Sequence, residues 1–175
     1  MEKIGLMVIL AFIFTGCTKY VIAPVKDDGK YGEYFEATIQ PFNNPNPNAQ
    51  VLPEKHRKNN QAIGFLLTIK NKTDKDLKLN WSKTLFISNG QTDGSFMLGA
   101  HLCADRNSEK IHDIIFPNSS LKKRIFPSHL VRGIKGGGCV GGMMGSGKLG
   151  VLLNLASGEK QMEKSIFVTI EKEIK

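Results

Sequence analysis

The sequence predicts an all-β protein whose strands form an antiparallel β-sandwich over residues 33–175. Three observations lead to this prediction. Apolar and polar residues alternate with a period of two in residues 63–70 and 76–81, as on a strand with one buried face. Turn-forming sequences separate further short runs of β-forming residues. No segment repeats apolar residues at helical spacing, and many short strands at this spacing favour a sandwich.

The clearest signal is a β-hairpin expected in residues 63–81. The polar run NKTDKD, residues 71–76, separates the two alternating segments and is the expected turn. The residues expected on the buried face are Ile63, Phe65, Leu67, Ile69, Leu77, Leu79 and Trp81. We therefore expect Trp81 to be a core residue rather than a platform on which a ligand stacks.

The remaining strands follow from β-forming runs between turn signals. Strands are expected in residues 33–42, 84–88, 110–116, 121–126, 151–156 and 165–173. Turn signals occupy residues 88–94, 117–120 and 156–159. Two long loops are expected, a proline- and asparagine-rich loop at 41–60 and a loop at 133–150 in which nine of eighteen residues are glycine. A loop of the first kind is either a functional excursion or partly disordered.

The N-terminus carries an export signal. Lys3 precedes an unbroken apolar run from Ile4 to Phe14. Eleven residues would rise about 16 Å as a helix, roughly half the hydrocarbon thickness of a bilayer, so the run is too short to span a membrane. Its length is that of the apolar region of a secretory signal peptide. Thr15 and Gly16, both small, then lead to Cys17.

Thr15-Gly16-Cys17 resembles the lipobox of bacterial lipoproteins, although Phe14 stands where an aliphatic residue is usual. The resemblance implies a signal peptide at 1–16, cleavage before Cys17, and acylation of that cysteine, with palmitate as a typical chain. Residues 17–32 would then be the lipid anchor and a linker. Thr18 at the following position implies sorting to the outer membrane, facing the periplasm. The alternative is an ordinary secretory signal with an incidental cysteine.

A second resemblance covers residues 63–127. The alternation that ends in Ile69-Lys70-Asn71, the segment from Leu77 to Trp81, and the segment IIFPNSSLKKRIFP at 114–127 are similar to small Ig-like lipoproteins of bacterial envelopes. This resemblance implies an Ig-like β-sandwich and no particular activity. Within 114–127 it implies a strand, a turn and a returning strand.

Two cysteines remain once Cys17 is set aside. Cys103 and Cys139 would lie in an oxidising compartment, so we expect a disulfide between them. The bridge would close a loop of about 36 residues and contribute about 3 to 4 kcal/mol. Two free buried thiols are the alternative. A third interpretation makes Cys139 a nucleophile, because GGGCVGG faintly resembles the cysteine motif of L,D-transpeptidases, with His129 as the nearest candidate base.

Other site motifs are weak. Residues 142–148 have the G-x-x-x-x-G-K spacing of a phosphate-binding P-loop, but Leu149 replaces the Ser or Thr that would hold magnesium. His101 and Cys103 are two residues apart, yet three or four converging zinc ligands are not visible. The lysines are dispersed and lack interleaved aromatic residues, which argues against nucleic acid as a partner. We expect no catalytic residue, no metal site, no cofactor and no nucleotide.

The sequence as a whole predicts a lipid-anchored protein of the cell envelope with a binding or structural role. The net charge of +8 favours anionic surroundings such as lipid headgroups, lipopolysaccharide, acidic glycans or nucleic acid, although a basic soluble surface alone would also explain it. We expect the protein to contact a partner protein or an anionic envelope polymer. The alternative function is a cell-wall (peptidoglycan) enzyme that uses Cys139 as its nucleophile.

Overall fold

The computed structural model describes residues 18–25, 29–43, 62–98, 108, 110–133 and 139–174 of the 175-residue chain. Every strand pair among these residues is antiparallel, so the predicted antiparallel all-β class is confirmed. The strands are β1 (Thr18–Pro24), β2 (Phe35–Phe42), β3 (Gly64–Asn71), β4 (Leu77–Leu79), β5 (Leu85–Ser88), β6 (Gln91–Leu98), β7 (Asp113–Ile115), β8 (Ser120–Pro127), β9 (Arg132–Gly133), β10 (Cys139–Val140), β11 (Gly147–Ser157) and β12 (Lys160–Ile174). Two 3₁₀ turns accompany them, η2 (Trp81–Lys83) and η4 (Ser128–Leu130).

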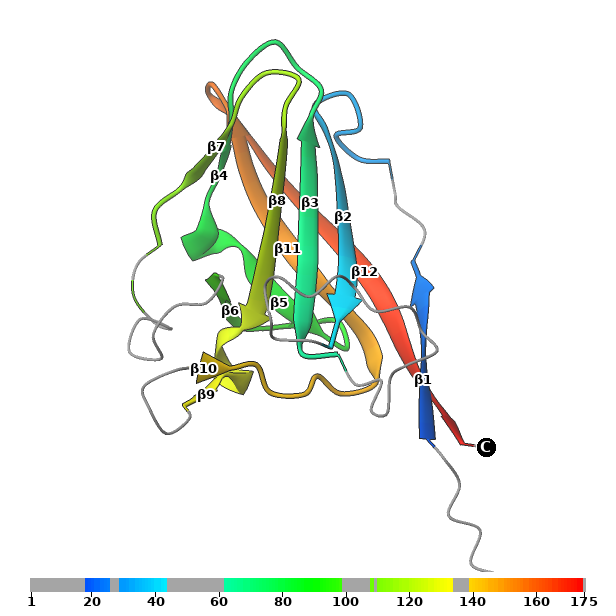
Figure 1. Cartoon of the computed structure of the whole chain (residues 1–175). Helices are drawn as coiled ribbons and strands as arrows, with labels where there is room; N and C mark the ends of the chain where they lie inside the picture. Colours follow the sequence, from blue (N-terminus) through cyan, green and yellow to red (C-terminus); the bar gives the residue numbers. More distant parts are fainter. Residues whose placement is uncertain are drawn as a thin grey trace, which may run out of the picture.

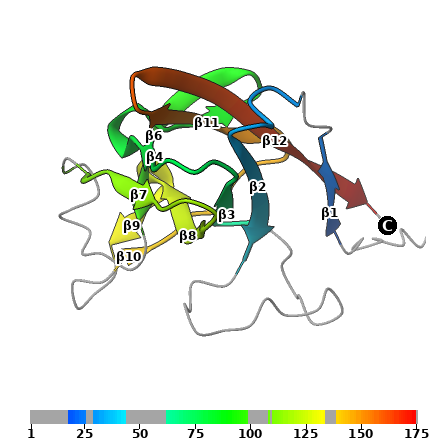
Figure 2. The same ribbon diagram turned by 90° about the horizontal axis from the view of Figure 1, so that it is seen from above.

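The main sheet has the order β1-β12-β11-β5-β6-β8-β3-β2, with β4 and β7 attached beside β11, and β9 and β10 form a separate pair. β6 joins the two halves of this sheet, because its first part pairs with β5 and its last three residues pair with β8. The sheet is nearly closed and barrel-like, since β2 comes back against β12 (Figure 1). Seen from above, β11 and β12 run along one side and β2, β3 and β8 along the other (Figure 2).

The core fills the space between these two sides. The predicted alternation on β3 and β4 is confirmed, because the side chains of Phe65, Leu67, Ile69, Leu77 and Leu79 are all fully buried. Alternate residues of β11 and β12 complete the core from the other side, among them Val151, Leu153, Leu155, Met162, Ile166 and Val168.

Trp81 lies in this core, as the sequence predicts, with 1% of its surface exposed. Its indole Nε1–H donates to Oδ2 of Asp113 at 2.8 Å, which satisfies the polar edge of the ring. The Lys123 ammonium pairs with the same carboxylate and lies 5.4 Å from the indole centroid. Trp81 therefore joins η2, β7 and β8 around one buried ring.

The predicted hairpin between residues 63–70 and 76–81 is wrong. β3 pairs with β2 and β8, whereas β4 pairs with β11 and β7, so the turn between them crosses from one half of the sheet to the other. Asn71 explains the crossing. Its fully buried side-chain amide donates to the carbonyls of Lys75, Ile115 and Phe116 at 2.7–3.1 Å. Its Oδ1 accepts from the backbone N–H of Thr73, so the turn folds around this side chain.

The strand pair predicted in 114–127 is wrong for the same reason. β7 and β8 exist, and residues 117–118 form the turn between them, but β7 pairs with β4 and β8 pairs with β3 and β6. The turn at 117–118 crosses between the halves beside the turn that follows β3, and Asn71 hydrogen-bonds both. By contrast, β11 and β12 do form a hairpin at the predicted turn, in which Gly158 has a φ of 58°.

Three further segments differ from the sequence prediction: the linker, β6 and the glycine-rich loop. The linker predicted for 17–32 is wrong in its first part, because Thr18–Pro24 form β1 and pair over seven residues with the end of β12, on the edge opposite β11. β6 was not predicted, because its first four residues are polar and exposed and carry no alternation. The glycine-rich loop predicted at 133–150 ends early, because β11 begins at Gly147. Most of the loop predicted at 41–60 lies outside the described residues.

Candidate functional site

The predicted lipid-attachment residue, Cys17, lies outside the described residues, but the chain that follows it is placed. β1 begins at Thr18, and Thr18 pairs with Ile174 at the end of β12. Only the Cys17–Thr18 peptide bond therefore separates a lipid attached at Cys17 from the main sheet. In the part of the chain that the structure describes, no helix is long and apolar enough to cross a membrane.

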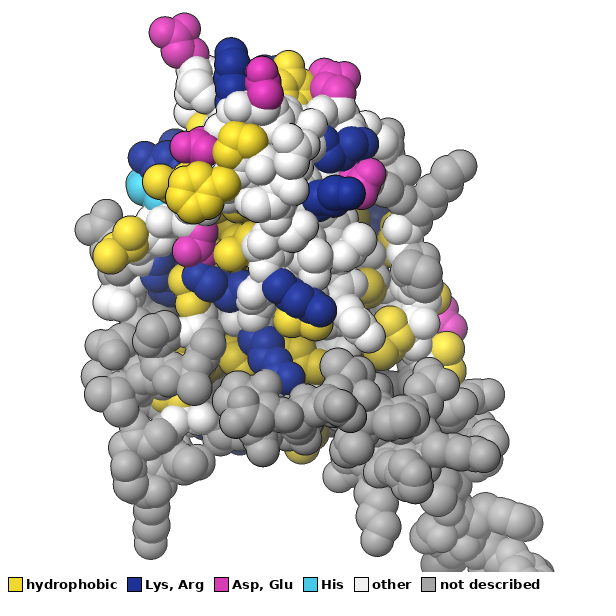
Figure 3. Space-filling view, turned by 45° about the horizontal axis from the view of Figure 1, so that its top comes forward, with side chains coloured by type: hydrophobic (Ala, Val, Ile, Leu, Met, Phe, Trp, Pro, Cys, Tyr) yellow, Lys and Arg dark blue, Asp and Glu magenta, His cyan; other side chains and the backbone are white. Residues whose placement is uncertain are grey.

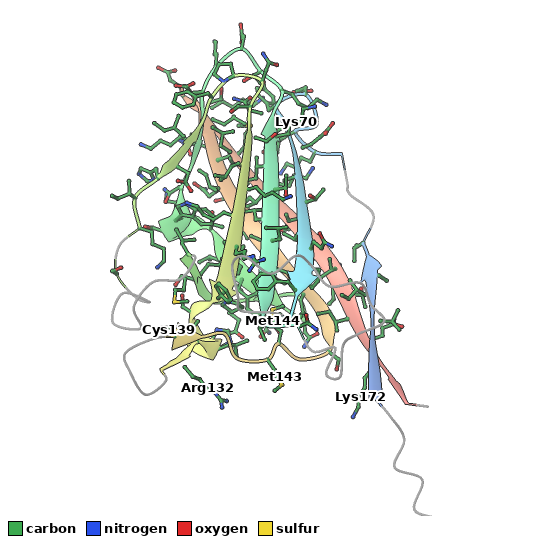
Figure 4. The ribbon with its side chains drawn as sticks, in the orientation of Figure 1. Lys70, Arg132, Cys139, Met143, Met144 and Lys172 are labelled. Atoms are coloured by element: carbon green, nitrogen blue, oxygen red, sulfur yellow. The ribbon has the colours of Figure 1, made fainter. Side chains whose placement is uncertain are left out.

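We call the end of the molecule where β1 starts the basal end, and the opposite end, with the β11–β12 turn, the distal end. Arg132, Met143 and Lys172 lie at the basal end (Figure 4). Arg132 and Lys172 are exposed, and 59% of the Met143 surface is exposed, whereas the neighbouring Met144 is buried at 1% and belongs to the core. The basal end thus presents two cationic side chains and one flexible apolar side chain.

The P-loop spacing at residues 142–148 does not produce P-loop geometry. The residues after the Gly-Lys pair continue as strand β11, which pairs with β12 and β5, whereas a P-loop requires a helix at this position. Lys148 lies over the ring of Phe167 at 4.2 Å. Gly150 is needed for packing rather than for phosphate contact, because a Cβ there would collide with the carbonyl of Ile166 and the ring of Phe167.

The two cysteines of the predicted disulfide are only half described. Cys139 is half-buried on β10, opposite Gly133 of β9, and packs against a small apolar cluster that includes Phe42, Met97 and Phe126. Cys103 lies outside the described residues, so the bridge between the two stays a prediction.

His129, the base suggested for a nucleophilic Cys139, lies on η4. Its Nε2 is 3.5 Å from Oδ2 of Asp93, and its ring lies 5.8 Å from the ring of Phe86. These contacts hold the imidazole over β5 and β6. A catalytic role of Cys139 stays a prediction that no described contact supports.

A polar pocket in the distal half brings together residues that the sequence did not predict as a site. It has a volume of about 480 Å³ and is lined by Lys30, Tyr31, Asn80, Lys83, Asn154, Gln161 and Glu163. Asn154 and Glu163 are directly opposite each other on β11 and β12, close to the β11–β12 turn. Asn80 is the residue before η2 and Lys83 is the last residue of η2, and Lys30 and Tyr31 belong to the turn before β2. The walls therefore come from three separate parts of the chain.

Hydrogen bonds fix the strand side of this pocket. The Asn154 side chain is 5% exposed, and its Nδ2 donates to Oε1 of Glu163 at 3.0 Å. The backbone N–H of Asn80 donates to the carbonyl of Asn154 at 2.9 Å, and the Asn80 side chain caps η2 by accepting from the N–H of Ser82. These contacts join η2 to the strands and keep the amide groups in place.

Lysines surround the turn before β2. Nζ of Lys164 is buried and donates to the carbonyl of Lys30 at 3.0 Å. Nζ of Lys160 donates to the Tyr34 hydroxyl at 2.6 Å, and this hydrogen bond raises the pKa of the fully exposed Lys160. Both ammonium groups therefore bind the turn to β12, and they add positive charge beside the pocket.

On the face that Figure 3 shows, the described residues form no single basic stripe. On the face that includes the distal end, lysine and arginine side chains are spread among acidic ones, with apolar side chains between them (Figure 3). Among the described residues, no group of three or more histidine, cysteine, aspartate or glutamate side chains could hold a metal ion. His112 is exposed beside β7, and His101 lies outside the described residues.

No family model matches this chain, and no characterised protein or solved structure is significantly similar to it.

Sequence reasoning missed the pocket because its residues come from segments far apart in the chain. One signal was present in the sequence. Asn154 is the single polar residue in the run Val151–Ala156, which is otherwise apolar and is predicted to be a strand. A polar residue buried in a core strand must be hydrogen-bonded, and such residues often belong to a site. The partners of Asn154 on η2 could not be found without the fold.

Proposed function

We propose that this chain is a lipid-anchored protein of the cell envelope, attached through Cys17 to the outer membrane and facing the periplasm. Its role is binding or structural rather than catalytic. It would hold a partner protein or an anionic envelope polymer close to the membrane.

One observation carries the proposal. The main sheet begins one residue after the lipobox cysteine, and β1 is held along its whole length by β12. An acyl group at Cys17 would therefore place the basal end directly at the bilayer surface. Arg132 and Lys172, which are exposed at that end, suit anionic headgroups, and the exposed Met143 suits the headgroup–acyl boundary.

The acyl chains would dominate the membrane affinity. Each buried methylene contributes about 0.8 kcal/mol, and one chain alone binds only reversibly, so stable attachment takes two or more chains. The basal cations would add about 1 kcal/mol each near an anionic surface. They would orient the domain rather than hold it at the membrane.

We also propose that the nearly closed sheet is an Ig-like β-sandwich whose two layers are joined at one corner by β6. The layers would be β1, β12, β11 and β5 on one side and β2, β3 and β8 on the other. A strand that passes from one layer to the other through a bulge is a recognised way to turn such a corner, and the β5–β6 register shifts between Leu85 and Ile87. An experimental structure with comparison of the strand connections would test this.

The anchoring proposal is tested by growing cells that express the chain with labelled palmitate. The wild-type chain is expected to take up label and to sediment with membranes. Cys17→Ser should abolish both, while the matched control Cys139→Ser should leave both unchanged. Labelling that survives Cys17→Ser, or a wild-type chain that takes up no label, would contradict the proposal.

A further inference from the structure

The distal pocket is a candidate ligand site because paired strands and hydrogen bonds hold several of its lining residues in place. Its volume of about 480 Å³ falls within the range of about 300–1,000 Å³ that is usual for small-ligand sites. Two of its walls rest on paired strands and on a capped 3₁₀ turn, which keep the side chains at fixed positions.

The lining excludes several ligand classes. None of the seven lining residues is aliphatic, so an apolar ligand would gain little by entering. Glu163 would repel a bare polyanion, whereas Lys30 and Lys83 would disfavour a cation. The three amides of Asn80, Asn154 and Gln161 each offer both a donor and an acceptor. A ligand that matches this set has several hydroxyl groups and one negative charge.

Asn154 gives independent support for a ligand with hydroxyl groups. Its side chain is 5% exposed, and its Nδ2 is bonded to Glu163. Among the described residues, its Oδ1 has no hydrogen-bond donor. Buried amide oxygens are nearly always hydrogen-bonded, so this acceptor at the pocket wall suits a hydroxyl from the ligand or a bridging water.

Tyr31, which also lines the pocket, has a strained backbone conformation. Its φ of 61° lies in the left-handed region, which is uncommon for a residue other than glycine. The strain is maintained by contacts on the turn, since the Tyr31 ring stacks on Phe35 with centroids 6.4 Å apart and Lys30 Nζ lies 4.9 Å from its centroid. Backbone strain of this kind concentrates at binding sites, where it fixes a side chain in its working position.

We propose that the distal pocket binds an acidic saccharide, that is, a sugar ring that carries a carboxylate or a phosphate group. The carboxylate of Glu163 and the amides of Asn154 and Gln161 would bond the ring hydroxyls. The ammonium of Lys83 would bind the negative group, because among the described residues no acidic side chain lies within ion-pair distance of it. This inference narrows the envelope-polymer role proposed above to one ligand class.

The site lies far from the proposed anchor. Glu163 and Ile174, which pairs with Thr18, are the two ends of a twelve-residue stretch of β12 and lie eleven residues apart. At about 3.3 Å per residue this stretch spans about 36 Å. A molecule attached at its basal end would therefore hold the pocket away from its own bilayer, where a saccharide of the periplasm or the cell wall could reach it.

The test is a titration of the full chain, purified in detergent, followed by NMR chemical shifts or calorimetry. The four probes are glucuronic acid, glucose 6-phosphate, glucose and inorganic phosphate. Glucuronic acid or glucose 6-phosphate should bind, and the stronger of the two identifies the carboxylated or the phosphorylated source. Glucose and inorganic phosphate should each bind about tenfold more weakly, because each lacks half of the contacts.

Two variants locate the binding, and a third is the matched control. Lys83→Gln should weaken the binding of the acidic sugar about tenfold and leave that of glucose unchanged. Glu163→Gln should weaken both sugars. Lys70→Gln, which removes an exposed lysine from β3, should change neither. Unchanged protein spectra would show that each variant is folded.

Three results would overturn the inference: no binding of either acidic sugar, glucose bound as tightly as they are, or inorganic phosphate bound as tightly and unaffected by Glu163→Gln. None of them bears on palmitate uptake, which tests the anchor separately.

Discussion

The two ends of the molecule are held together in different ways. At the distal end, the turns after β3 and β7 fold around the buried side chain of Asn71, and β11 turns tightly into β12 at Gly158. At the basal end, the short pair of β9 and β10 and the glycine-rich residues 141–145 carry little regular structure. Within residues 141–145 the Met144 side chain belongs to the main core, while Met143 beside it is exposed.

This difference suits the two roles that we propose for the two ends of β12, membrane contact at the basal end and ligand binding at the distal end. The distal end is rigid because buried side-chain hydrogen bonds specify its turns, and rigid walls suit a pocket that must hold polar groups in place. The basal end relies on backbone contacts, on the buried Met144, on the small apolar cluster that includes Phe42, Met97 and Phe126 and, as we propose, on a disulfide. The long unbranched side chains of Arg132, Met143 and Lys172, which lie exposed there, suit contact with a fluid surface rather than with a shaped ligand.

The largest expected effect distinguishes the two adjacent methionines of the basal end. Met144→Ala removes a fully buried side chain from the core and is expected to lower the free energy of unfolding by about 2–5 kcal/mol. Met143→Ala, the matched control, should change it by less than about 0.5 kcal/mol. Urea denaturation measures both. Equal effects would mean that the basal segment does not anchor in the core as described.

The next largest change in the free energy of unfolding is expected for the predicted disulfide. If Cys139 is bridged to Cys103, Cys139→Ser should lower the free energy of unfolding by about 3–4 kcal/mol under oxidising conditions. Cys103→Ser should have the same effect, and the double variant should add nothing more. Mass spectrometry of the non-reduced chain checks the bridge directly. Two thiols that react with an alkylating agent would end the proposal.

The distal end is tested through Asn71. Asn71→Ala leaves the buried carbonyl of Ile115 without its donor and removes the acceptor that holds Thr73, so a loss of about 2–3 kcal/mol is expected. The exposed neighbour on the same strand, Lys70→Ala, should lie within about 0.5 kcal/mol of the wild type. A small effect of Asn71→Ala in urea denaturation would show that another contact specifies the crossing.

The strand content could be predicted from the sequence, but the pairing could not. The period of two in β3 and β4 correctly gave the buried faces, because side-chain alternation is a local property. It also suggested a hairpin. No local feature of the sequence distinguishes a turn that joins two neighbouring strands from a turn that crosses from one half of the sheet to the other half. Asn71 decides between them through carbonyls 44 and 45 residues away in the sequence.

The site could be predicted only in part. The residues that resemble a lipobox are continuous in the sequence, so lipid attachment at Cys17 could be proposed from them, and it stays a prediction. The pocket was not, because Lys30, Asn80 and Glu163 meet only once β12 has returned beside η2 and the turn before β2. β1 was missed because its partner, the edge of β12 opposite β11, comes from the other end of the sequence and is available only in the folded sheet.

The central claim is that acyl chains at Cys17 hold this domain at a membrane with no linker between anchor and sheet. Intact mass and N-terminal peptide mass of the chain isolated from membranes test it most directly. We predict a mature chain that begins at Cys17 and carries diacylglycerol on that residue, with or without an acylated amino group. A chain that still begins at Met1, or one whose Cys17 carries no lipid, would contradict the account.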